Sequence, residues 1–109
     1  MTIGLFGAPF YGRIFILEEF METRVAVIGI IVEKEDSVNK LNALLHNYGK
    51  YIVGRMGIPY REKDINIISI VIDAPQDVIS TLSGKIGALD GVSAKAAYSA
   101  VKKGDGNAD

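Results

Sequence analysis

The sequence predicts an α+β domain of the ferredoxin-like βαββαβ type, with a four-stranded antiparallel sheet and two helices on one face. The main observation is an internal repeat: "VAVIGIIVEKEDSV" from Val25 and "INIISIVIDAPQDV" from Ile65 each give an apolar run, an acidic residue and a helix start. Each half then continues through a helix into another strand, "YIVGRMGI" in the first half and "GVSAKAAY" in the second. Between the halves, the polar segment "PYREKD" predicts a hairpin.

Length and composition limit the possible functions. The 109 residues suit one domain with a modest core. With 12 basic and 13 acidic residues there is no global positive field, so we expect no direct binding of nucleic acid. The lack of cysteine excludes disulfides, thiolate nucleophiles and cysteine-bound metals. Because the longest apolar run is too short to cross a bilayer, we expect no membrane segment. We expect a cytoplasmic protein without a cofactor.

The two ends differ from the body of the chain. Residues 1–20 are rich in Phe, Gly and Ile and lack the positive region and cleavage site of a signal peptide. Since a strand begins directly after Met21, we interpret residues 1–20 as an N-terminal extension upstream of a true start at Met21. The ferredoxin-like domain is expected over residues 22–99, and residues 100–109 are expected to be a disordered tail.

Two helices are predicted from caps and apolar spacing. The first has Asp36 or Ser37 as its N-cap and ends before Gly49, and the second has Pro75 in its first turn. The stripes expected to be buried are Val38, Leu41, Leu45 and Tyr48 in the first helix and Val78, Leu82 and Ile86 in the second.

The strands that contain Val25 and Ile65 are apolar on both faces, as is typical of a sheet covered on both sides. The residues expected to face the helices are Ile28, Ile30, Val32, Ile68, Ile70 and Ile72, and those expected to face away are Val25, Val27, Ile31, Ile65, Ile67 and Val71. Two helices cover only one face, and a small domain rarely exposes a large apolar patch. We therefore predict a homo-oligomer, a dimer or a tetramer, formed through the open sheet face.

Candidate ligand or interface residues come from the strand "YIVGRMGI" and its counterpart in the second half. If Ile52, Met56 and Ile58 face the helices, alternation turns the neighbouring residues to the open face. The candidates are Tyr51, Val53, Arg55 and Gly57, together with Lys95, which the repeat places at the matching position of the last strand. Arg55 and Lys95 are expected on opposite edge strands, about 14 Å apart, so a shared site could form only between subunits.

Several residues have more than one interpretation. Arg55 is either an anion ligand or an edge charge that discourages misassembly. Gly54 and Gly57 either let a ligand or partner approach closely or mark a bulge or bend. His46 is expected to be a surface residue, because a metal site needs several converging ligands. The segment "SGKIG", 83–87, lacks the spacing and context of a phosphate-binding loop. With no nucleophile beside a base and no paired carboxylates, no catalytic or metal site is predicted.

The segments "RVAVIGIIVE", "LHNYGKYIVGRMGIPYREK", "INIISIVIDAP" and "LSGKIGALDGVSAKAAYS" resemble the family of proposed iron-only hydrogenase system regulators. These are small ACT-like proteins related in fold to the C-terminal domain of the nickel-responsive repressor. The resemblance covers about Glu22 to Ser99 and implies a ferredoxin-like fold, a homo-oligomer and a role attached to hydrogenase maturation. It brings no catalytic residues.

The chain departs from the implied pattern in two respects. Residues 1–20 are too short for the DNA-reading domain of the nickel-responsive repressor, and a single histidine without cysteine excludes nickel sensing by the same ligands. The loop after the first strand, "EKEDS", lacks the glycine of many amino-acid-binding ACT domains.

Two functions are therefore predicted as alternatives. The first is a non-enzymatic regulatory domain of the iron-only hydrogenase system that senses a small ligand at a subunit interface and acts through an unknown protein partner. The second is an assembly or structural factor of hydrogenase maturation without a ligand.

Overall fold

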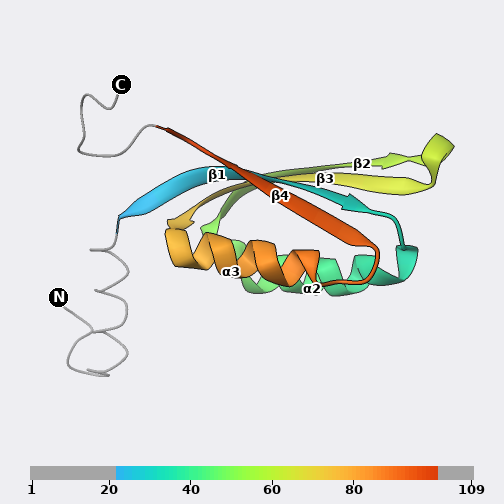
Figure 1. Ribbon diagram of the computed structural model, residues 1–109, viewed down its shortest axis with the longest axis horizontal. Helices are drawn as coiled ribbons and strands as arrows, with labels where there is room; N and C mark the ends of the chain where they lie inside the picture. The colour runs from blue at the N-terminus through green and yellow to red at the C-terminus, as the bar shows by residue number, and fades with distance from the viewer. Residues whose placement is uncertain (1–21, 101–109) are drawn as a thin grey trace.

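The computed structural model describes residues 22–100 and contains one four-stranded sheet with both helices on the same face (Figure 1). In chain order the elements are β1 Thr23–Val32, η1 Glu35–Ser37, α2 Val38–Asn47, η2 Gly49–Tyr51, β2 Ile52–Tyr60, η3 Arg61–Lys63, β3 Ile65–Pro75, α3 Gln76–Gly87 and β4 Val92–Tyr98. The strand order is β2-β3-β1-β4, and every pairing is antiparallel. The predicted ferredoxin-like fold is confirmed. The predicted extension over residues 1–20 and residues 101–109 of the predicted tail lie outside the described residues.

The core lies between the sheet and the two helices. The six strand residues predicted to face the helices are all buried: Ile28, Ile30, Val32, Ile68, Ile70 and Ile72. From the helix side, α2 buries Leu41 and Leu45, while α3 buries Ile79, Leu82 and Ile86. Each fully buried Ile or Leu side chain stabilises the fold by roughly 1.5–3 kcal/mol relative to an exposed one. This single layer of aliphatic side chains is therefore the main source of stability within one copy of the domain.

Both helices lie where the apolar spacing predicts them, with small differences. The outer members of the predicted stripes, Val38, Tyr48 and Val78, are only partly buried against the core. In α3 the additional buried residue is Ile79, which the predicted stripe omits. Pro75 is the last residue of β3 and the N-cap of α3, so it precedes the first turn. Its fixed φ suits this change from strand to helix.

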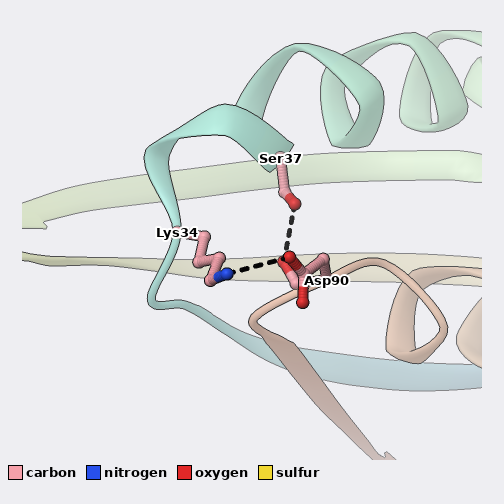
Figure 2. A network of polar contacts seen from close by, with 3 residues as sticks. All are labelled: Lys34, Ser37 and Asp90. Carbon is pink, nitrogen blue, oxygen red and sulfur yellow. Dashed lines mark hydrogen bonds and ion pairs between the residues drawn. The ribbon is translucent and has the colours of Figure 1, made fainter.

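The start of α2 is tied to a distant loop. Ser37 occupies the N-cap position, but its side chain makes no capping hydrogen bond. Instead, the Ser37 hydroxyl donates to the carbonyl oxygen of Asp90 at 2.6 Å, and Lys34 Nζ lies 3.1 Å from Asp90 Oδ2 (Figure 2). The backbone N–H of Glu33 donates to the carbonyl oxygen of Gly91 at 2.7 Å. The loop after β1 is therefore fastened to the loop before β4.

The edge strand β2 contains an irregularity that reverses its faces. Ile52 pairs with Ile72 and Gly54 pairs with Val71, so Val53 is an extra residue on β2. This is a β-bulge, one of the two interpretations left open for the glycines of this strand. One extra residue turns every later side chain of the strand to the other face. The predicted orientation is correct at Ile52 and wrong beyond the bulge.

Candidate binding site on the open sheet face

The sheet face turned away from α2 and α3, which we call the open face, is apolar across three strands. Its large apolar residues are Val25, Val27 and Ile31 of β1, Ile65, Ile67 and Val71 of β3, and Met56, Ile58 and Tyr60 of β2. The six from β1 and β3 are those predicted to face away from the helices, and the three from β2 are added by the bulge. Their side chains are exposed or half-buried, up to 60% exposed at Met56. A continuous apolar surface of this kind on a small domain indicates a binding surface.

Lys95 lies on the open face, as predicted, because it pairs with Gly29 of β1. Together with Ser93, Gly29, Ile31 and Ile67 it lines a hollow of about 490 Å³. Within residues 22–100, the Lys95 ammonium forms no ion pair with a carboxylate. The hollow thus combines an apolar wall with one available positive charge.

Arg55 lies on the helix side of the sheet, so its predicted place on the open face is wrong. It pairs with the fully buried Ile70, and its Nη2 donates a hydrogen bond to Oδ1 of Asn42 in α2 at 3.0 Å. The cause is the bulge at Val53, which shifts the alternation by one residue. Arg55, Asn42 and His46 border a separate hollow of about 330 Å³ between α2 and β2.

The remaining candidates are not gathered at one place either. Gly57 pairs with Ile68 and so also faces the helices, which corrects its predicted orientation. Tyr51 belongs to η2, before the strand, and packs at the edge of the core, with its ring centroid 6.5 Å from that of Tyr48. Val53 is the bulge residue and is 70% exposed. Lys95 lies on the face where the prediction places it, whereas Arg55 and Gly57 lie on the other face. The ligand or interface role of all five residues stays a prediction.

The two edge residues cannot share a site within one chain. Arg55 is on β2 and Lys95 is on β4, and these strands form the opposite edges of the sheet, as predicted. The bulge also places the two side chains on opposite faces. Any anion held by Lys95 must therefore find its other contacts on the open face itself or on another molecule.

The described part of the chain offers few groups of side chains that could hold a metal ion or act on a substrate. Over residues 22–100, no three side chains of His, Cys, Asp or Glu come together as metal ligands. None of the helices in this range is long and apolar enough to span a membrane. His46 is exposed on α2, as predicted. The open face can thus act mainly by burying apolar surface, with Lys95 as its cation.

These features define a small α+β domain that carries its helices on one face of the sheet and exposes large apolar side chains on the other. The chain belongs to the TM1266-like family, described as "Iron-only hydrogenase system regulator, putative", whose model matches residues 24–96. A solved structure, that of the uncharacterized protein TM1266 from Thermotoga maritima, is similar to it with 37% sequence identity and a TM-score of 0.68. The match covers 71% of this chain and 98% of TM1266. No curated protein matches the chain.

The comparisons confirm the resemblance to proposed regulators of the iron-only hydrogenase system. The description of the family is that of a regulator, which suggests a role other than catalysis.

Proposed function

We propose that the protein is a non-enzymatic regulatory domain of the iron-only hydrogenase system. In this proposal it forms a homo-oligomer through the open face, binds a small ligand at that interface and passes the signal to a partner protein. The observation that supports it most directly is the exposed apolar surface of β1, β3 and β2. Burial of such a surface against a second copy removes apolar area from water at about 25 cal/mol per Å².

The size of the open face is consistent with this proposal. Four strands about 4.8 Å apart, and the 10 residues of β1 at about 3.4 Å each, give an area of roughly 19 Å by 34 Å. Because the outer strands are shorter, covering this face would remove roughly 600 Å² from each copy, or about 1,200 Å² in total. That is the lower end of the range for specific protein interfaces.

The charge balance supports action through a partner protein. With 12 basic and 13 acidic residues the chain has no positive field for direct association with nucleic acid. A regulatory effect on the hydrogenase system is therefore assigned to contact with another protein, whose affinity changes with the state of the oligomer.

Sedimentation velocity at micromolar concentration tests the oligomer directly. We expect the wild-type chain to sediment as a dimer or a tetramer. Replacement of the half-exposed Val27 by Lys should give a monomer with an unchanged circular dichroism spectrum. In the monomer the new ammonium stays in water, whereas in the oligomer it would be buried without a partner, which is costly. The matched control is Asn47→Lys, which adds the same charge at an exposed position of α2 and should leave the oligomer intact. A wild-type chain that is a stable monomer at these concentrations contradicts the proposal.

A further inference from the structure

A trough crosses the open face at right angles to the strands. The strand register places four residues in one transverse row from β2 to β4: Met56, Ser69, Gly29 and Lys95. The two central residues are Ser69 of β3 and Gly29 of β1. On each of these strands, no other residue of the open face has a smaller side chain. A Cβ atom built on Gly29 would come no closer than 4.0 Å to any atom beyond its chain neighbours, so a side chain has room here. We call this row the trough.

On the two central strands, the rows on both sides of the trough carry bulky side chains. The row on one side consists of Ile58, Ile67, Ile31 and Ser93, and the row on the other consists of Gly54, Val71, Val27 and Ala97. Above the two central strands, the trough is therefore walled by Ile67 and Ile31 on one side and by Val71 and Val27 on the other. Its Lys95 end coincides with the hollow of about 490 Å³.

The chemistry of the Lys95 end selects the charge of a ligand. Lys95 and Ser93 are two residues apart on β4, so their side chains point to the same face, and both line the hollow. The backbone N–H groups of the inner strands add no donors here, because they are used in the sheet ladder. One ammonium and one hydroxyl suit a carboxylate with a single charge, whereas a phosphate group is usually held by several donors or an Arg fork.

We propose that the trough binds an organic carboxylate with an apolar body. The carboxylate lies against Lys95 and Ser93, and the apolar body extends over Gly29 and Ser69 toward Met56. The distance from β4 to β2 is three strand spacings, about 14 Å, which accommodates a chain of about eight carbons. This inference rests on the proposed function, since a second copy packed on the bulky rows would close the trough over the ligand.

Isothermal titration of the full chain with octanoate tests the proposal, with octanol as the uncharged molecule of the same body. We expect saturable binding of octanoate to the oligomer, and binding of octanol about tenfold weaker, because a hydrogen bond to a charged group is worth about that factor. Lys95→Gln should weaken octanoate about tenfold and leave octanol unchanged. Gly29→Leu should abolish binding of both probes, because the leucine side chain fills the trough. The fold should tolerate this change, since a Cβ atom at this position has no close neighbour.

The outcomes separate the two proposals. A wild-type monomer in sedimentation contradicts the proposed function. An oligomer that binds neither probe overturns the trough alone. The trough is also overturned if Lys95→Gln weakens both probes equally or neither of them, or if Gly29→Leu, still oligomeric, binds octanoate as the wild type does. Replacement of exposed Lys85, on α3, by Gln removes the same charge elsewhere and should change neither affinity.

Discussion

Gly91 shows how one residue sets the contact between the two loops at the end of the sheet. Its φ of +70° lies in the left-handed region, where glycine has no steric cost. A Cβ atom at this position would lie 2.5 Å from Lys34 Cγ and 2.8 Å from Lys34 Cβ, so the start of the Lys34 side chain would also have to move. Since the Gly91 carbonyl accepts the hydrogen bond from Glu33, a displaced Gly91 would strain the end of β1 as well.

We expect Gly91→Ala to lower the free energy of unfolding by about 2 kcal/mol, from the left-handed backbone and the contact with Lys34. The control is Gly84→Ala within α3, where a Cβ atom meets nothing within 4 Å. That change should raise stability by roughly 0.5–1 kcal/mol, because alanine favours a helix more than glycine does. Urea unfolding of both variants at one protein concentration measures the difference. Equal stabilities of the two variants would contradict the role assigned to Gly91.

The strands show which parts of the fold could be predicted from the sequence. β1 and β3 alternate without interruption, so their apolar pattern correctly predicts which residues face the helices and which lie on the open face. In β2 the same rule fails because Val53 is an extra residue, and alternation carries the error to every later position. The only signal was Gly54 beside Val53, and glycine in a strand indicates a bulge without saying which residue is extra. The prediction therefore turns Met56 and Ile58 to the helices and Arg55 to the open face, and the structure reverses all three. Lys95 lies on a regular strand and is placed correctly.

Deletion of Val53 should be tolerated, because it removes the extra residue and leaves Ile52 and Gly54 opposite successive residues of β3. The side chain is 70% exposed, so little apolar burial is lost, and we expect a change in melting temperature of only a few degrees. The matched deletion of Met56 interrupts a regular ladder and turns the rest of β2 to the wrong face, so it should be much more destabilising. Thermal unfolding followed by circular dichroism compares the two. Similar losses would mean that Val53 is not the extra residue.

At the scale of the whole molecule, the domain is small and has one layer of core, so much of its stability is expected to come from association. The core lies on one side of the sheet, and the open face leaves Val25, Val27, Ile31, Met56 and Ile58 more than 40% exposed in a single copy. Burial of these residues in an oligomer couples dissociation to unfolding, because the unfolded chain does not associate.

The melting temperature should therefore rise with protein concentration. If a dimer unfolds to two chains, the unfolding enthalpy of about 0.7 kcal/mol per residue gives a rise of about 5 °C for each tenfold increase in concentration. Val27→Lys should melt at a lower temperature that does not depend on concentration, since its monomer has no interface to lose. Asn47→Lys should follow the wild type. Differential scanning calorimetry between micromolar and hundred-micromolar chain measures all three proteins, and a wild-type melting temperature that stays constant over this range would show that the open face does not contribute to stability through self-association.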